Sequence, residues 1–220
     1  MIVNERAAAY IRSLETAERA VLEQIEREAL EQRIPIIRKE TQGFLKVLLC
    51  MKKPKKILEI GTAVGFSALL MSEYVPEDCR IITIENYAKR IPVAKANFER
   101  MGKERQIALI EGDALDVLKG LDAGFDFIFM DAAKGQYIYY LPEVLRILEE
   151  DGILLSDNVL QGGDVLESRF AVERRDRTIH ARMREYLYEL KHHDSLMTSI
   201  LPLGDGVAVS VKRSDIAGRA

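Results

Sequence analysis

An apolar strand that runs into a turn of small residues and then into a helix most constrains how this chain can fold. The segment covers residues 55–67 and reads KKILEIGTAVGFS. Gly61 and Gly65 permit backbone conformations and close approaches that a side chain would block, and Ala63 takes the small middle position. The amides that open the next helix face the same side. Such a turn is typical of nucleotide-like ligand binding, although it also occurs for packing alone.

Short apolar runs alternate with amphipathic segments after Pro54. The expected strands cover residues 57–60, 80–85, 106–111, 125–131 and 152–157, and the expected helices cover 67–74, 88–101, 114–121 and 138–149. This alternation predicts an α/β fold with a parallel, doubly wound sheet. A charged helix over about 173–192 precedes apolar runs at 197–203 and 207–212, with Gly204-Asp205-Gly206 between them. That turn predicts a hairpin, so we expect a Rossmann-like sheet of seven strands whose last strand is antiparallel.

The first 51 residues are helical and charged in pattern, with a break at Ile34-Pro35, which predicts a helical N-terminal layer. The chain has 220 residues, of which 48% are hydrophobic, and a formal net charge of −3. These values fit one domain over residues 1–220, and the charge does not indicate a nucleic-acid binder. Two cysteines, Cys50 and Cys79, predict neither a disulfide framework nor a cysteine metal site. Without a signal core or a span-length apolar run, we expect a cytoplasmic protein without membrane contact.

The predicted strands end in acidic residues. Ligands of open α/β sheets bind beyond the carboxyl ends of the strands, so these residues are candidates for a site. Glu85 ends the second strand and follows Gly61 at roughly the 20-residue spacing at which a carboxylate accepts hydrogen bonds from ribose hydroxyls. Asp113, followed by Ala114, comes after the third strand. Asp113 is also a preferred helix N-cap residue, and the two roles are compatible.

A second acidic set follows the fourth and fifth strands. Asp131 ends one strand, and Asp157 and Asn158 end the next. Because these strands are expected to be neighbours, the three side chains should converge. Hard oxygen ligands of this kind suit Mg²⁺, Mn²⁺ or Ca²⁺, and three protein ligands leave positions for a substrate. The alternative is that each residue only caps a loop.

Four ordered motifs resemble the cation-dependent O-methyltransferases, the family of catechol and caffeoyl-CoA O-methyltransferases. They are residues 59–67, Gly112-Asp113-Ala114, Asp131-Ala132-Ala133-Lys134 and Asp157-Asn158-Val159-Leu160. The segment 131–137, Gly162-Gly163, the arginine-rich helix and Gly204-Asp205-Gly206 further resemble the bacterial tRNA 5-hydroxyuridine methyltransferases, which make 5-methoxyuridine in the anticodon loop. The resemblance implies S-adenosylmethionine as methyl donor, a divalent metal such as Mg²⁺ and a homodimer.

Residue roles follow from this resemblance position by position. Gly61 and Ser67 would contact the methionine end of the donor, Glu85 its ribose, and Asp113 with Ala114 its adenine. Ile37 would close over the donor. Asp131, Asp157 and Asn158 match the metal ligands of the family. Ala63 departs from the common glycine pattern, as is frequent in this subgroup.

Lys134 matches the proposed general base of the family. It follows Asp131 by three residues, where a divalent cation would disfavour its ammonium form, so it could accept the acceptor's hydroxyl proton near neutral pH. A metal at this position would stabilise the deprotonated acceptor. The alternative is a solvated loop lysine.

The acceptor is the least constrained feature of the sequence. Six arginines between residues 169 and 184 suit phosphate contacts, or form only a solvated helix face. Tyr137, Tyr139 and Tyr140 could stack on a base or pack on the sheet. A tRNA substrate leads, and a small catechol, phenol or caffeoyl-CoA-like acceptor is the alternative. A nicotinamide-dependent dehydrogenase or a non-catalytic nucleotide module is more distant, because it gives Asp157 and Asn158 no role.

Overall fold

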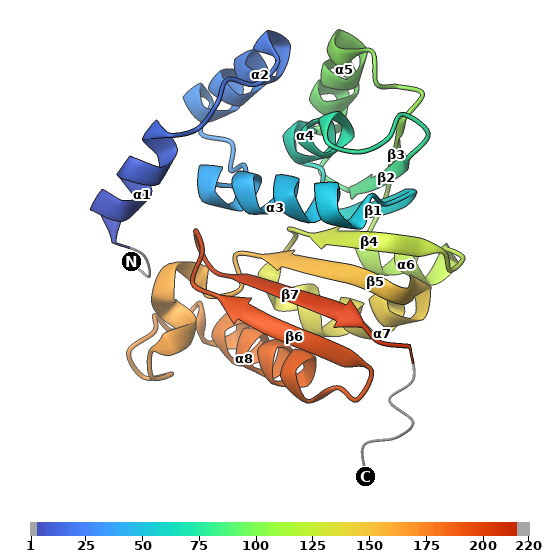
Figure 1. The fold of residues 1–220 in the computed structure, drawn as a ribbon. Coiled ribbons are helices and arrows are strands. Elements are labelled where there is room, and N and C mark those ends of the chain that lie inside the picture. The colour runs from blue at the N-terminus through green and yellow to red at the C-terminus, as the bar shows by residue number, and fades with distance from the viewer. Residues whose placement is uncertain (1–3, 215–220) are drawn as a thin grey trace.

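The computed structural model describes residues 4–214, and strand and helix alternate in it from residue 56 onward. The strands are β1 (Lys56–Ile60), β2 (Arg80–Glu85), β3 (Ile107–Glu111), β4 (Phe125–Met130), β5 (Leu148–Asp157), β6 (Leu196–Leu201) and β7 (Val207–Lys212). They form one seven-stranded sheet in the order β3-β2-β1-β4-β5-β7-β6 (Figure 1). Strands β1 to β5 pair in parallel, whereas β7 is antiparallel to both β5 and β6. The predicted Rossmann-like sheet is therefore confirmed.

Helices cover both faces of the sheet (Figure 1). They are α1 (Glu5–Ser13), α2 (Ala20–Glu31), α3 (Lys39–Lys52), α4 (Phe66–Glu73), α5 (Ile91–Met101), α6 (Ala114–Gly120), α7 (Tyr137–Ile147) and α8 (Arg177–His192), with short 3₁₀ turns η1 (Lys134–Gln136) and η2 (Gln161–Leu166). One apolar core joins α2, α3, α4 and α5 to one face, and a second joins α6, α7 and α8 to the other. Alternate strand residues supply the two cores, as Ile57 and Leu58 do in β1.

The structure corrects several expected boundaries, including the starts of α5 at Ile91 and of β5 at Leu148. The N-terminal helical pattern is interrupted after Ser13 as well as near Pro35, and Glu15 and Glu18 in this interruption form ion pairs with Lys46 of α3 at 3.3 and 2.9 Å. Helix α7 ends at Ile147, since Leu148 already pairs with Phe125 of β4. Helix α8 begins at Arg177 and leaves residues 173–176 outside it.

The carboxyl ends of β1, β2, β4 and β5 meet at one edge of the sheet, where the chain crosses from one half of the sheet to the other. The backbone N–H of Gly61 donates to the Ile84 carbonyl at 3.1 Å, and that of Asp131 donates to the Ile60 carbonyl at 3.0 Å. These bonds join the ends of β1, β2 and β4 at the edge where open α/β sheets bind ligands. Over residues 4–214, none of the helices has the length and apolar character needed to cross a membrane.

Candidate active site

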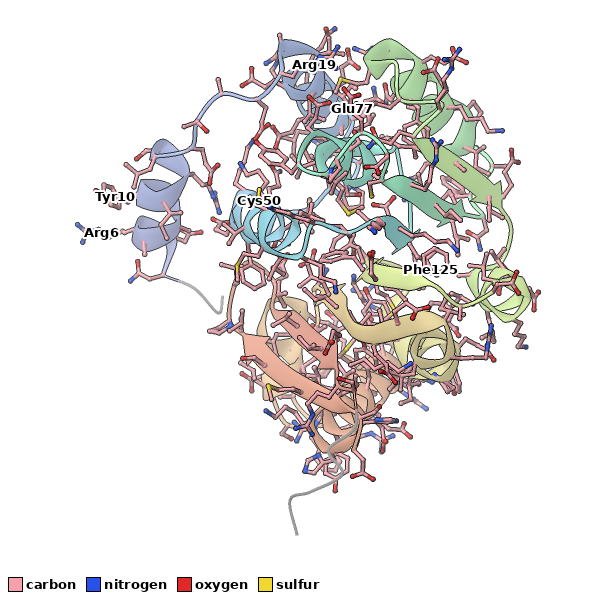
Figure 2. All side chains as sticks on the ribbon, turned by 45° about the vertical axis from the view of Figure 1, so that its right-hand side comes forward. Arg6, Tyr10, Arg19, Cys50, Glu77 and Phe125 are labelled. Atoms are coloured by element: carbon pink, nitrogen blue, oxygen red, sulfur yellow. The ribbon has the colours of Figure 1, made fainter. Side chains whose placement is uncertain are left out.

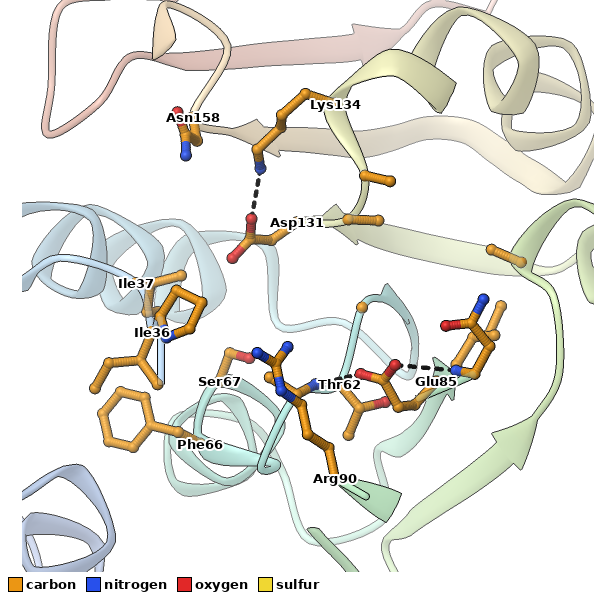
Figure 3. A pocket seen from close by; sticks show the side chains of 18 of the residues that line it. Ile36, Ile37, Thr62, Phe66, Ser67, Glu85, Arg90, Asp131, Lys134 and Asn158 are labelled. Atoms are coloured by element: carbon orange, nitrogen blue, oxygen red, sulfur yellow. Dashed lines mark hydrogen bonds and ion pairs between the residues drawn. The ribbon is translucent and has the colours of Figure 1, made fainter. Parts of the chain in front are cut away.

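A cavity of about 330 Å³ opens at this carboxyl edge (Figure 3). It brings together most of the predicted site residues: Ile37, Gly61, Ser67, Glu85, Ala114, Asp131, Lys134 and Asn158. Two predicted residues, Asp113 and Asp157, do not line it. The segments that meet here lie far apart in the sequence, so the cavity is a product of the strand order.

The turn after β1 is held open by glycine. A Cβ at Gly61 would lie 2.1 Å from the Asp131 carbonyl oxygen, and Gly61 has a φ of +103°. Gly65, the N-cap residue of α4, has a φ of +83°, and a Cβ there would lie 2.5 Å from the Phe98 ring. Neither position tolerates a side chain without movement of its neighbour. Gly61 therefore allows the end of β1 to approach the end of β4, and Gly65 allows the start of α4 to approach Phe98 of α5.

Glu85 organises the rim of the cavity. Its Oε2 accepts the Ala63 N–H at 2.8 Å, and its Oε1 accepts the N–H groups of Asn86 and Tyr87 at 3.0 and 2.9 Å. Ala63 itself has a φ of +48°, a left-handed conformation that is unfavourable for a residue with a Cβ. A carboxylate has about four acceptor positions, so one remains for a ligand hydroxyl.

Asp113 serves as the N-cap of α6. Its Oδ1 accepts the N–H groups of Leu115 and Asp116 at 2.9 and 3.4 Å, and the side chain does not line the cavity. The neighbouring residues Gly112 and Ala114 do line it. The structure therefore confirms the capping role of the Asp113 side chain, and a ligand contact from this turn stays a prediction.

A buried carboxylate beneath the turn of residues 61–65 was not among the predicted site residues. Glu59 of β1 is fully buried and accepts hydrogen bonds from Ser67 Oγ at 2.5 Å and from the Thr83 hydroxyl. Burial raises the pKa of Glu59 to about 7, against the lowering effect of the two hydroxyl donors. The signal in the sequence was a single acid in the apolar run 57–60, because a charge in a buried strand needs partners.

Lys134 and Asp131 face each other on the other side of the cavity (Figure 3). The Lys134 Nζ donates to Asp131 Oδ1 at 2.6 Å, to Tyr137 Oη at 2.9 Å and to the Asp157 carbonyl at 3.3 Å. Burial opposes the charge on Lys134, but Tyr137 and Asp131 outweigh it and raise the pKa of the ammonium above its usual value. A solvated loop lysine is therefore not what the structure shows. A divalent cation on Asp131 would oppose this stabilisation.

The predicted metal ligands Asp131, Asp157 and Asn158 come from two neighbouring strand ends. Asp157 is 6% exposed, and burial together with the charge of Asp131 raises the pKa of Asp157 to about 7. Asn158 has a φ of +58° and lines the cavity. Among the described residues, no group of three His, Cys, Asp or Glu is arranged to hold a metal ion. Two carboxylates and an amide are nevertheless hard oxygen donors that fit Mg²⁺, and the Lys134 ammonium contacts the Asp131 carboxylate and the Asp157 backbone carbonyl.

The tyrosines beside this site divide into packed and exposed residues. Tyr137 is fully buried, its hydroxyl donates to the Met130 carbonyl at 3.0 Å, and its ring packs edge-on against Tyr186. It therefore packs on the sheet and cannot stack on a base. Tyr139 is 47% exposed and lies under the Arg182 guanidinium, whereas Tyr140 lines the cavity.

The arginines of residues 169–184 also divide into two groups. Arg177, Arg182 and Arg184 donate to the backbone carbonyls of Val172, Gly135 and Val165. Arg175 pairs with two acids, Glu173 and Asp176. Across the described part of the chain, Arg169 and Arg174 make no side-chain hydrogen bond or ion pair. All the N–H donors of these two guanidinium groups are therefore available to a phosphate, whereas the other four arginines each use at least one on a protein partner.

Arg90 is a charged cavity residue that the sequence did not indicate. It lies at the start of α5, its guanidinium is 5.3 Å from the Tyr87 ring centroid, and it points into the cavity (Figure 3). A lone arginine before a proline-containing helix carries no local sign of such a role. Only the path of the loop after Glu85 places it there.

Comparison with known proteins places these features in a family. A family model described as O-methyltransferase matches residues 12–213. A methyltransferase from Podospora anserina, solved with SAH bound, has 27% identity and a TM-score of 0.84, over 96% of this chain and 95% of that one. Caffeoyl-CoA O-methyltransferase 2 of Populus trichocarpa is 31% identical over 180 residues, which are 76% of this chain and 70% of the relative.

A catechol O-methyltransferase of Niastella koreensis is 38% identical over 128 residues. This match covers 56% of the present chain and 58% of the relative, so the chain matches little more than half the length of that protein. The family model, in contrast, extends from before β1 to the end of β7 and includes the sheet edge where the cavity lies.

Proposed function

This chain belongs to the O-methyltransferase family, and we propose that it transfers the methyl group of S-adenosylmethionine to a hydroxyl oxygen of its acceptor. The observation that carries the proposal is the shared cavity. The glycine turn and Glu85 lie on one side of it, and Asp131, Lys134 and Asn158 lie on the other. A donor held by the first group would place its methyl group toward the second.

The residues divide the work of donor binding. Glu85 offers a carboxylate for the ribose hydroxyls, and the Gly61 turn allows the donor to approach the backbone. Ser67 lines the cavity while its hydroxyl is held by the buried Glu59, which fixes its rotamer. Ile37 lines the cavity from the segment before α3 and excludes water from that side.

The acceptor side supplies the proton chemistry. The reaction breaks a carbon–sulfur bond, forms a carbon–oxygen bond and releases the hydroxyl proton. A divalent metal held by Asp131, Asp157 and Asn158 would favour the deprotonated acceptor. Lys134 is within hydrogen-bonding distance of Asp131 and is the base nearest to this position. Its ammonium must lose a proton before it can act, so the base role depends on the charge placed beside Asp131.

Activity with and without chelator tests this proposal. Methyl transfer from labelled S-adenosylmethionine should require a divalent cation and stop in excess EDTA, while donor binding measured by calorimetry should persist. Full turnover in excess EDTA would exclude the metal-dependent mechanism. Failure to bind S-adenosylmethionine at all would exclude the methyltransferase itself.

For the acceptor we propose 5-hydroxyuridine in the tRNA anticodon loop, which methylation converts to 5-methoxyuridine. The two unpaired arginines, Arg169 and Arg174, support an acceptor that carries phosphates. A small phenolic acceptor is the second candidate, and the catechol and caffeoyl-CoA O-methyltransferases among the similar proteins favour it. Mass spectrometry of tRNA nucleosides from cells with and without the protein separates the two.

A homodimer is also part of the proposal. Apolar side chains on the outer side of α1 and at the end of α3 support it: Tyr10, Leu14 and Met51 are 66%, 63% and 76% exposed. Figure 2 shows Tyr10 on α1, turned away from the body of the molecule. Large apolar side chains that face solvent are candidates for contacts between proteins. Sedimentation equilibrium gives the mass of the assembly directly.

A further inference from the structure

The hairpin turn between β6 and β7 lies between the first turn of α3 and the loop after β5. A Cβ at Gly204 would lie 2.9 Å from Thr41 Oγ1, on the N-terminal side. A Cβ at Gly206 would lie 2.4 Å from Leu160 Cγ, in the loop after β5. Both glycines have positive φ, of +56° and +92°. The turn therefore fits between its two neighbours with no room for a side chain on its glycines.

On one side the turn fixes the loop that carries Asn158. The N–H of Val159 donates to the Gly206 carbonyl at 2.9 Å, and the N–H of Leu160 donates to the Asp205 carbonyl at 3.1 Å. Asn158, directly before them, holds a left-handed conformation that is costly for a residue other than glycine. The turn thus supports the backbone that keeps this predicted metal ligand at the cavity.

On the other side the turn is tied to the segment that covers the donor cavity. Arg38 Nε donates to Asp205 Oδ2 at 2.7 Å, and the two residues are 167 positions apart in the sequence. Ile36 and Ile37, which directly precede Arg38, line the donor cavity. Arg38 is the N-cap residue of α3, and Thr41 in the first turn of that helix donates to Asp157 Oδ1 at 3.4 Å.

We propose that Arg38 and Asp205 are positioning residues that couple the donor-covering segment 36–37 to the loop that carries Asn158. The Arg38–Asp205 ion pair joins the segment before α3 to the hairpin turn. The hydrogen bonds from the Val159 and Leu160 N–H groups join the hairpin turn to the loop that carries Asn158. A donor held against segment 36–37 would thereby stabilise the conformation of the loop that carries Asn158. This inference rests on the proposed metal-dependent methyl transfer.

Binding of Mn²⁺, measured by electron paramagnetic resonance with and without saturating S-adenosylhomocysteine, tests the coupling. The wild-type protein should bind Mn²⁺ more tightly when S-adenosylhomocysteine is present. In Arg38→Gln this enhancement should disappear, and Mn²⁺ affinity should fall about two- to fivefold, as for the removal of a half-exposed ion pair. Simple electrostatics predicts the opposite sign, because removing a positive charge near a cation site should tighten Mn²⁺ binding.

Asp205→Asn should have the same effect, and the reversed pair Arg38→Asp with Asp205→Arg should restore the enhancement. Glu143→Gln is the matched control, because Glu143 pairs with Arg146 at 2.7 Å and its exposure of 25% equals that of Asp205. It should bind Mn²⁺ as wild type does. Tighter or unchanged Mn²⁺ binding in Arg38→Gln would overturn the coupling. A wild type that binds no Mn²⁺ would instead overturn the metal-dependent function on which it rests.

Discussion

A Cβ added to Gly61 would lie 2.1 Å from the carbonyl oxygen of Asp131, so the ends of β1 and β4 meet at a distance that only glycine permits. Gly61 begins the turn after β1, which we assign to donor binding, and Asp131 directly follows β4, on the side that we assign to the acceptor. The same contact therefore brings the two halves of the site together. Even an alanine in place of Gly61 should therefore disturb the site.

Gly61→Ala should lower the free energy of unfolding by at least about 2 kcal/mol, because it adds a clash to an unfavourable φ of +103°. Gly102→Ala is the matched control, since Gly102 also has a positive φ, of +65°, but no atom within 4 Å of the added Cβ. That variant should be destabilised by about 1 kcal/mol. Urea denaturation compares the two, and equal destabilisation would contradict the steric argument.

Glu85→Gln should weaken binding of S-adenosylmethionine by about tenfold, because a charge-assisted hydrogen bond to a hydroxyl is replaced by a neutral one. In the variant, the side-chain NH2 group would also face backbone N–H groups that donate hydrogen bonds to Glu85 in the wild-type protein. Glu111→Gln, at the end of the neighbouring strand, is the control, because Glu111 pairs with Lys95 and does not line the cavity, so donor affinity should stay normal. Calorimetry measures both. Unchanged affinity in Glu85→Gln, or tighter binding of a nicotinamide dinucleotide, would remove the donor assignment.

Glu59 gives the protein without donor a characteristic pH dependence. Burial raises the pKa of Glu59 from 4.5 to about 7, so between these values the folded protein keeps a proton that the unfolded chain releases. The contribution of Glu59 to stability should therefore be full below pH 4.5, fall by about 3 kcal/mol as pH rises to 7, and then level off. Unfolding free energies at pH 5 and 8 for wild type and Glu59→Gln check this. A difference between the two proteins that does not change with pH would show that Glu59 does not titrate in this range.

Asp157 and Asp131 should have separable effects, because Asp131 lines the donor cavity and Asp157 does not. Asp157→Ala should abolish turnover and leave donor affinity within about twofold of wild type. Asp131→Ala should reduce both, since it also removes the partner of the Lys134 ammonium. Calorimetric titration with S-adenosylhomocysteine alongside a turnover assay provides the comparison. A large drop in donor affinity in Asp157→Ala would contradict this division.

Substitution of Arg169 and Arg174 by Gln should weaken tRNA binding and flatten its salt dependence, because fewer phosphates are neutralised. The slope of the logarithm of the binding constant against the logarithm of the salt concentration should fall in magnitude by about 0.7 to 0.9 for each phosphate that the variant no longer binds. Arg175→Gln is the control, because its guanidinium already pairs with Glu173 at 3.0 Å. Methylation of a catechol should not respond to any of these changes. Normal tRNA binding by the double variant, or wild-type protein that methylates catechols and leaves tRNA untouched, would favour the phenolic acceptor.

The order of elements and the positions of the strand ends could be read from the sequence. Apolar runs and amphipathic segments encode strand and helix locally, and the rule that ligands bind beyond parallel strands then selects Glu85, Asp131 and Asn158. The Gly204–Gly206 turn likewise predicted the β6–β7 hairpin. These features depend on residues close together in the chain, which is why pattern alone was sufficient.

The partners of the side chains were decided only by the tertiary structure. Tyr137 entered the core and Arg182 bonded to the Gly135 carbonyl, although each had been a candidate for a ligand contact. A long polar side chain binds whatever packing brings near it, and packing joins segments such as those of Arg38 and Asp205 from opposite ends of the chain. The sequence by itself therefore determined which residues reach the carboxyl edge of the sheet, whereas only the folded arrangement decided which of them face the cavity.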